Sequence, residues 1–196
     1  KPSVIREILK SVTPDMIAFA AGNPSTETFP IDEMGEIANS LFADKSRIAG
    51  ILQYGVSEGY QPLRELCFSR MRGKYQTGGD QDELIITSGG QQAIDLLTKA
   101  MVDPGDTVIV EGPSFIGSLN TFRTYQANLV AVPMQSDGMD LDALEHCLKT
   151  EKNVKFIYII STFQNPSGYT TSLEKRRAIL ALAQKYDVLI LEDNPY

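Results

Sequence analysis

The stretch VKFIYIISTFQNPSG, residues 154–168, joins an apolar segment to a polar turn. Its first part, 154–162, is rich in Val, Ile and Tyr at successive positions, which is typical of a strand buried on both faces of a parallel sheet. The Asn-Pro pair that follows indicates a chain reversal just beyond that strand. The stretch therefore predicts a parallel sheet whose strand ends carry polar side chains such as Asn165.

Similar strand-sized segments occur both before and after this stretch. They are ELIITSGG (83–90), TVIVEGP (107–113), ANLVAVPM (127–134) and VLILED (188–193). Segments of helical period lie between them, with apolar faces at Ile94, Leu97 and Met101, at Leu141, Leu144 and Leu148, and at Ile179, Leu182, Ala183 and Tyr186. Thr171 and Glu174 form a potential capping box for the last of these helices. This alternation predicts an α/β fold of three layers, with helices on both faces of a mostly parallel sheet.

The first 80 residues follow a different pattern. Two helices are indicated, one by Met34, Ile37, Ala38, Leu41 and Phe42 and the other by Leu63, Leu66 and Cys67, and loops rich in Gly, Pro and Ser separate them. We expect residues 1–55 to form an N-terminal arm and a segment of a small domain. Residues 56–196 are expected to form the first part of a large domain.

Composition excludes several classes of partner. Eighteen basic and 25 acidic residues give a net charge of -7, which argues against nucleic acid because a polyanion needs excess Lys and Arg. No apolar run approaches the about 18 residues that a membrane span requires. Cys67 and Cys147 lie far apart, outside any metal-binding spacing, so neither a metal site nor a disulfide framework is indicated. A soluble protein of the reducing cytoplasm is expected.

Two strand ends carry features of a ligand site. The segment 83–87 leads through Gly89 and Gly90 to Gln91 at the start of a helix, where free backbone N–H groups favour a phosphate. A tight turn that needs glycine for conformational reasons explains the same residues. Phe115 follows the strand at 107–113 and is either an aromatic wall above the sheet edge or a core residue.

The last two strands deliver an amide, an acid and a phenol. Asn165 follows 154–162, whereas Asp193 ends the segment 188–193 and Tyr196 lies three residues later. An acid at a strand end also fits a helix N-cap or a solvated sheet edge. Because the carboxyl ends of parallel strands meet at one edge of a sheet, however, these groups converge. Together with the glycine turn and Phe115 they predict a pocket for an aromatic, phosphorylated, nitrogen-containing ring.

The chain resembles the fold-type-I pyridoxal-phosphate aminotransferases of classes I and II over essentially its whole length. The motifs occur in family order and are LQYGVSEGYQPLRE (52–65), TSGGQQAIDLL (87–97), EGPSF (111–115), FQNPSGYTTS (163–172) and LEDNPY (191–196). SVIREILK (3–10) and FAAGNPSTETFP (19–30) are most similar to the 2-aminoadipate and kynurenine aminotransferase branch. The resemblance implies transfer of an amino group between an α-amino acid and a 2-oxo acid.

The resemblance also implies roles for residues around the cofactor ring. Asp193 would pair with the protonated pyridine nitrogen, which a nearby carboxylate stabilises and which makes the ring an electron sink. Tyr196 and Asn165 would hydrogen-bond the phenolic oxygen of the ring. Phe115 would stack on its face.

The phosphate end is assigned in the same way. Gly89, Gly90 and Gln91 would hold the phosphate through backbone amides and the Gln side chain. Gly90 stands where many relatives have Ser or Thr, so one hydroxyl donor is missing. Tyr54 would reach the phosphate of a neighbouring subunit, which implies a homodimer.

On the substrate side, the resemblance implies that Gly22 and Asn23 belong to a loop that closes over the substrate, and that Arg6 contacts an acidic substrate side chain. The lysine that forms a Schiff base with the cofactor lies beyond the Asp-x-x-Tyr motif in the family, so we expect no catalytic lysine in these residues and no activity from them in isolation. A β-lyase or decarboxylase with the same cofactor, and an aminotransferase-like sensory domain of a transcription regulator, remain alternatives.

Overall fold

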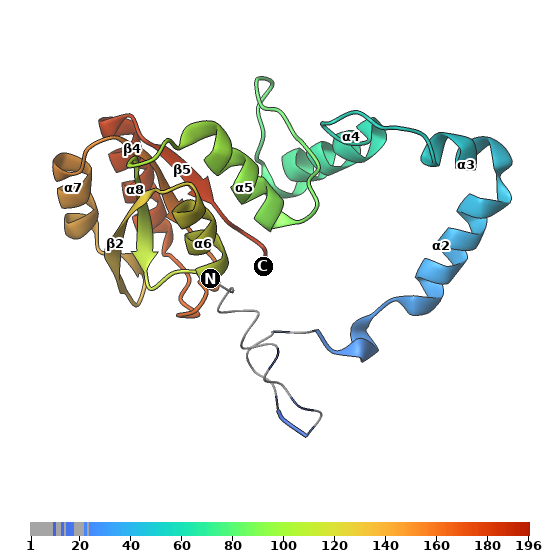
Figure 1. The fold of residues 1–196 in the computed structure, drawn as a ribbon, viewed down its shortest axis with the longest axis horizontal. Coiled ribbons are helices and arrows are strands. Elements are labelled where there is room, and N and C mark those ends of the chain that lie inside the picture. The colour runs from blue at the N-terminus through green and yellow to red at the C-terminus, as the bar shows by residue number, and fades with distance from the viewer. Residues whose placement is uncertain (1–9, 11–12, 14, 18–21, 23) are drawn as a thin grey trace. The chain divides into compact units, whose positions relative to one another are not determined.

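The computed structural model describes residues 10, 13, 15–17, 22 and 24–196, and the chain divides into two compact units, Lys1–Ile86 and Thr87–Tyr196 (Figure 1). The second unit contains a five-stranded sheet in the order β3-β2-β1-β4-β5. The strands are β1 Thr107–Gly112, β2 Asn128–Gln135, β3 Gly138–Met139, β4 Val154–Ile159 and β5 Leu189–Glu192. All neighbouring pairs are parallel except β2 with the short β3, which confirms the predicted mostly parallel sheet.

Helices cover both faces of this sheet. They are α5 Gly90–Met101, α6 Ile116–Thr124, α7 Leu141–Thr150 and α8 Leu173–Tyr186. Side chains alternate between the faces along each strand, so Val108 and Val110 pack with α5 and α6 while Ile109 packs with α7 and α8. The two resulting cores establish the three-layer arrangement expected from the sequence.

Three aromatic rings organise the core on the α5 and α6 side. Phe122 of α6 contacts Phe156 and Tyr158 of β4 edge to face, with ring centroids 5.5 and 5.3 Å apart. All three rings are at most 1% exposed. Burying an aromatic ring of this size contributes about 1.5–3 kcal/mol, so α6 is held firmly against β4.

Two sequence-based expectations are wrong. Residues 83–87 form no strand of the sheet; the backbone hydrogen bond found there runs from the Ile86 N–H to the Glu58 carbonyl, and a strand needs a paired neighbour. The N-cap of α8 is Ser172, whose hydroxyl accepts from the Lys175 N–H at 3.3 Å, and not Thr171. Thr171 is unsuited to this role because its side chain packs over Gly138.

The first unit is helical in its described part. It contains η1 Thr26–Thr28, α2 Ile31–Ala43, α3 Lys45–Ile51, α4 Gln61–Arg70 and the π-helical turn η2 Met71–Tyr75. The two helices expected from the apolar pattern are therefore present as α2 and α4, and α3 is additional. Asp44 caps α3 by accepting from the Ser46 and Arg47 N–H groups. None of the described residues of this unit is buried, and the predicted division at residues 55 and 56 stays a prediction.

None of the helices in the described part of the chain combines the length and apolar character needed to cross a bilayer. That same part contains no cluster of three or more His, Cys, Asp or Glu side chains that could hold a metal ion.

Candidate functional site

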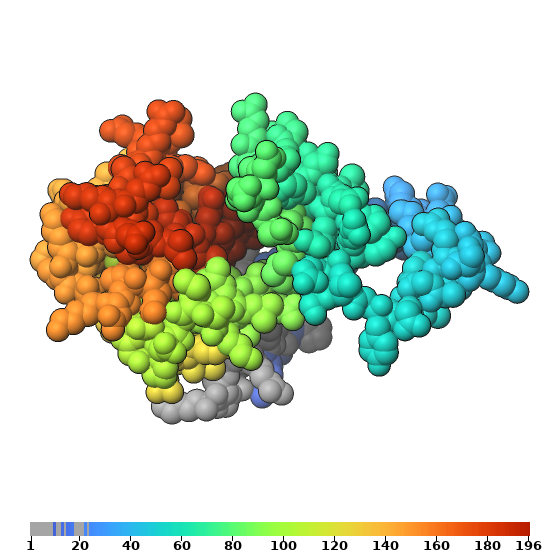
Figure 2. Space-filling model, turned by 90° about the horizontal axis from the view of Figure 1, so that it is seen from above, coloured from blue at the N-terminus to red at the C-terminus, as the bar shows by residue number. Residues whose placement is uncertain are grey.

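A cavity of about 290 Å³ lies at the carboxyl ends of β1, β4 and β5. Its lining residues are Gly90, Gln91, Ile94, Phe115, Ile160, Asn165, Asp193, Pro195 and Tyr196. The C-terminal residues thus lie beside the start of α5, as the space-filling view of Figure 2 also shows. Six residues singled out in the sequence line this one pocket: Gly90, Gln91, Phe115, Asn165, Asp193 and Tyr196.

The start of α5 forms one wall of the pocket. Gly89 precedes the helix with φ +83°, a left-handed backbone conformation that favours glycine. Gly90 and Gln91 then occupy the first helical turn, where backbone N–H groups have no partner within the helix. The Gln91 amide nitrogen donates to Thr121 Oγ1 of α6 at 2.6 Å, which fixes its side chain. This wall suits an anion.

Phe115 supplies a flat apolar wall at the N-cap of α6. Its position depends on Gly117, because a Cβ there would lie 2.5 Å from the ring and 2.9 Å from Gln91 Oε1. The space above Gly117 is therefore filled by the two side chains that line the pocket. Only glycine at this position allows both to remain in place.

Asp193 is held from behind by the sheet. Its backbone N–H donates to the Ile159 carbonyl at 2.9 Å, and its Oδ2 accepts from the Tyr158 hydroxyl at 2.7 Å. Tyr158 in turn accepts from Ser118 Oγ at 2.8 Å. No helix begins at Asp193 in the described residues, and the side chain is half-buried, so neither a helix N-cap nor a fully solvated edge describes it.

A buried acid connects the two turns that carry Phe115 and Asn165. Glu111 at the end of β1 accepts from the Ile160 N–H at 3.1 Å and from Gln164 Nε2 at 3.0 Å. Gln164 also donates to the Pro113 carbonyl at 2.8 Å. Glu111 is only 2% exposed, and this burial raises its pKa to about 7.

Tyr196 closes the pocket on the C-terminal side. Its ring lies edge to face with Phe163, with centroids 6.4 Å apart, and the residue is 66% exposed. Asn165 is half-buried in the turn that follows Phe163. The pocket lining therefore includes an amide and a phenol.

Of the remaining sequence candidates, only Gly89 belongs to the unit that contains this pocket. Gly89 adjoins it without lining it. Tyr54 is 99% exposed in the first unit, and Gly22 is exposed with φ +59°. Arg6 and Asn23 lie outside the described residues.

Sequence reasoning missed the residues behind the pocket. Tyr158 follows the period-two pattern of its strand, so nothing distinguishes it from a core residue until its hydroxyl is seen to reach Asp193. Glu111 offered a signal, because an acid directly after four buried positions requires hydrogen-bonding partners. Gln164 precedes the Asn-Pro turn, and nothing in the sequence shows that its side chain reaches Glu111 and the Pro113 carbonyl.

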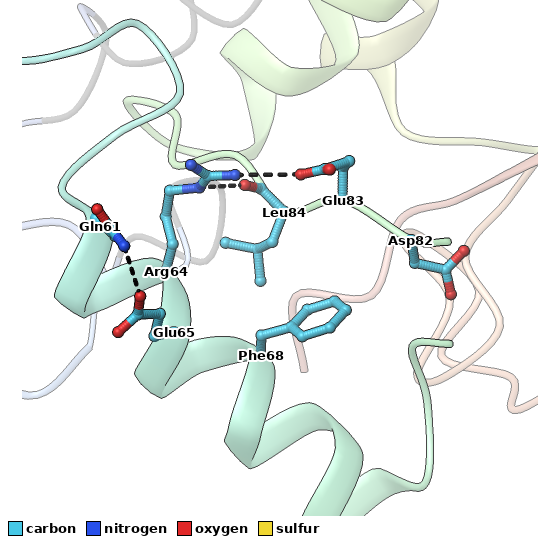
Figure 3. A pocket seen from close by; sticks show the side chains of 7 residues that line it. All are labelled: Gln61, Arg64, Glu65, Phe68, Asp82, Glu83 and Leu84. Atoms are coloured by element: carbon cyan, nitrogen blue, oxygen red, sulfur yellow. Dashed lines mark hydrogen bonds and ion pairs between the residues drawn. The ribbon is translucent and has the colours of Figure 1, made fainter. Parts of the chain in front are cut away.

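A second cavity, of about 270 Å³, lies in the first unit between α4 and residues 82–84 (Figure 3). Arg64 points along it and donates through Nε to the Leu84 carbonyl at 2.6 Å while pairing with Glu83 at 3.3 Å. Gln61 donates to Glu65 at 2.8 Å. These polar groups stabilise the local structure, and we assign the cavity no ligand.

Comparison with known proteins matches this arrangement to one class. Residues 14–196 match the family model described as aminotransferase class I and II. The chain is 41% identical to aromatic-amino-acid aminotransferase 1 of Thermococcus litoralis and 38% identical to 2-aminoadipate transaminase of Thermus thermophilus. These alignments cover 100% and 99% of this chain but 48% and 47% of the relatives.

Solved structures agree. The kynurenine aminotransferase of Pyrococcus horikoshii, crystallised with PMP, superposes with a TM-score of 0.91 at 36% identity. The superposition covers 100% of this chain and 49% of the Pyrococcus chain. The chain belongs to the class I and II aminotransferase family. It spans about half the length of the relatives it matches.

Proposed function

We propose that the complete protein containing this chain is a pyridoxal-phosphate-dependent aminotransferase that moves an amino group between an α-amino acid and a 2-oxo acid. The observation that carries this proposal is Asp193, anchored by Tyr158 in the same pocket as the start of α5 and Phe115. The relatives reported above are aminotransferases, which favours transamination over the lyase, decarboxylase and regulator alternatives.

The residues of the pocket fit this cofactor. Pyridoxal phosphate, when bound, supplies an electron sink for the charge that develops when the substrate loses its α-proton. Asp193 would stabilise the protonated ring nitrogen, and Phe115 would stack on the ring. The N–H groups of Gly90 and Gln91 at the start of α5 would bind the phosphate, with Gly89 providing the turn. Asn165 and Tyr196 would then hydrogen-bond the phenolic oxygen.

Other elements of the proposal lie beyond the pocket. The lining contains no lysine, so we propose that the lysine of the reaction comes from the part of the family's length that this chain does not span. Tyr54 is proposed to reach the phosphate in a second subunit of a homodimer. Gly22 and Asn23 are proposed to close over the substrate, and Arg6 to contact its side chain. The two cysteines, which form no disulfide, support a cytoplasmic location.

The substrates to test first come from the names of the relatives. An aromatic amino acid, kynurenine and 2-aminoadipate are the amino donors suggested by those names. A 2-oxo acid is the acceptor. We propose an aromatic or acidic amino donor for this protein.

The function is tested with the complete protein and two aspartate variants. We expect the unaltered protein to bind pyridoxal phosphate and convert at least one of these donors to its 2-oxo acid in step with amination of the acceptor. Asp193→Ala loses a charge-assisted contact and should bind the cofactor at least about tenfold more weakly. Asp142→Ala on the exposed face of α7 is the matched control and should bind normally. Release of ammonia or carbon dioxide in place of coupled amination would contradict transamination.

A further inference from the structure

A buried tyrosine links the pocket acid to helix α6. The Tyr158 hydroxyl donates to Asp193 Oδ2 at 2.7 Å and accepts from Ser118 Oγ at 2.8 Å. Tyr158 and Ser118 are both 0% exposed. The chain of hydrogen bonds therefore runs from α6 through β4 to the residue that follows β5, entirely behind the pocket.

Only one of the two carboxylate oxygens of Asp193 accepts a hydrogen bond from the described residues. Oδ2 is used by Tyr158, and the backbone N–H is used by the Ile159 carbonyl. Among the described residues nothing hydrogen-bonds Oδ1, although the residue lines the cavity. One oxygen thus remains for a ligand while the other fixes the orientation of the group.

The tyrosine is suited to hold that orientation. Phe122 and Phe156 belong to the same core cluster as Tyr158, and the Phe122 ring contacts the Tyr158 ring edge to face with centroids 5.3 Å apart, so the tyrosine is closely packed. Burial raises the pKa of Tyr158; the hydrogen bond from Ser118 lowers it in part, and the hydrogen bond to Asp193 and the charge of that carboxylate raise it further. The phenol therefore stays protonated at neutral pH and remains a donor.

We propose that Tyr158 is a positioning residue that aligns the Asp193 carboxylate with the ring nitrogen of the bound cofactor. The inference rests on the proposed function. Without the phenol, Asp193 would lose its partner at Oδ2 and could rotate away from the ring. Ser118 supports the same alignment indirectly, because its hydrogen bond to the Tyr158 hydroxyl orients that hydroxyl toward Asp193.

The test uses Tyr158→Phe in the complete protein, with pyridoxamine 5'-phosphate labelled with ¹⁵N at the ring nitrogen as the probe. We expect about tenfold weaker binding, since a hydrogen bond to a charged group is lost. We also expect the pH at which the ring nitrogen loses its proton to fall by about one unit, because a misaligned carboxylate stabilises the protonated ring less. The ¹⁵N chemical shift measures this midpoint.

Two further variants separate alignment from packing. Ile157→Val disturbs the core on the other face of the same strand without touching these hydrogen bonds or the aromatic cluster, and it should leave the midpoint unchanged. Ser118→Ala should lower the midpoint in the same direction by less than Tyr158→Phe, and it carries the test if Tyr158→Phe does not fold. An unchanged midpoint and affinity in both Tyr158→Phe and Ser118→Ala, with binding lost in Asp193→Ala, would overturn this inference and leave the proposed function standing. No binding by the unaltered protein would overturn both.

Discussion

At the scale of single residues, the site depends on a few buried polar groups whose partners come from distant parts of the chain. Glu111 receives its hydrogen bonds from Ile160 and Gln164, and Asp193 receives its bond from Tyr158. Each pair joins different strands or turns at the carboxyl edge of the sheet. The pocket is therefore shaped by interactions that lie just beneath its surface.

Glu111 makes the stability of the fold depend on pH. Its pKa is raised from the usual 4.5 to about 7 because burial disfavours the charged form. Above pH 4.5 the folded state therefore holds a proton that the unfolded state has lost. The contribution of this carboxyl group to the unfolding free energy is complete at low pH and is lost as the pH rises through about 7. As the pH rises from about 5 to about 8, we expect the unfolding free energy of the native protein to fall by up to about 3 kcal/mol relative to that of Glu111→Gln.

Urea unfolding of the complete protein at a series of pH values measures this difference. Glu174→Gln on the exposed side of α8 gives the background for a neutralised surface acid. Unfolding free energies of the native protein and of Glu111→Gln that change in parallel across this pH range would contradict the prediction. They would mean that Glu111 has the same pKa in the folded and unfolded states.

At the scale of elements, the turn from β1 into α6 sets the aromatic wall of the pocket. The helix begins at Ile116, directly after Phe115, and its second residue is Gly117. The bond from Gln91 to Thr121 then ties α6 to the start of α5. The starts of α5 and α6 and the turn between β1 and α6 are thus packed against one another.

Replacing Gly117 with alanine should disrupt the packing between the starts of α5 and α6. The new methyl group would overlap the Phe115 ring and the Gln91 side chain, so one of them must move. We expect a loss of about 1–3 kcal/mol in unfolding free energy and weaker cofactor binding. Gly35→Ala is the matched helical control, because a Cβ there meets no atom within 4 Å and should be neutral or slightly stabilising. Thermal unfolding and cofactor titration measure both effects, and cofactor affinity equal to that of the control would contradict the role of Gly117.

At the scale of the whole molecule, the buried residues among those that the structure describes all belong to the second unit. Its two cores occupy both faces of the sheet, whereas α2 leaves Met34, Ile37 and Phe42 at least 55% exposed. A helix with an apolar face gains most of its stability from packing that face. The first unit has no such packing among its described residues.

This difference predicts how residues 1–196 behave when prepared alone. We expect slow amide hydrogen exchange only within 87–196, in β1, β4 and the helices that cover them, and fast exchange in α2 and α3. Apolar dye binding should report the exposed side chains of the first unit. Protection of α2 comparable with that of β1 would contradict this expectation, and the isolated preparation is also expected to lack transaminase activity.

The sequence by itself determined the fold class, because apolar runs with strand and helix periods are local properties of the chain. It also indicated which side chains follow the strands, so Phe115, Asn165, Asp193 and Tyr196 could be predicted to converge. It failed at 83–87, which has the composition of a strand but no paired neighbour in the sheet. It also misplaced the cap of α8 by one residue, because packing of Thr171 against Gly138 decides between two adjacent hydroxyls.

Only the tertiary structure decided what holds the site in place. The bonds from Tyr158 to Asp193 and from Gln164 to Glu111 span 35 and 53 residues of sequence. No periodicity records such a separation, because hydrogen-bond geometry depends on where β1, β4 and β5 lie next to one another in the sheet. The local pattern of the chain thus specifies which chemical groups reach the pocket, and the packing of the sheet specifies their orientation.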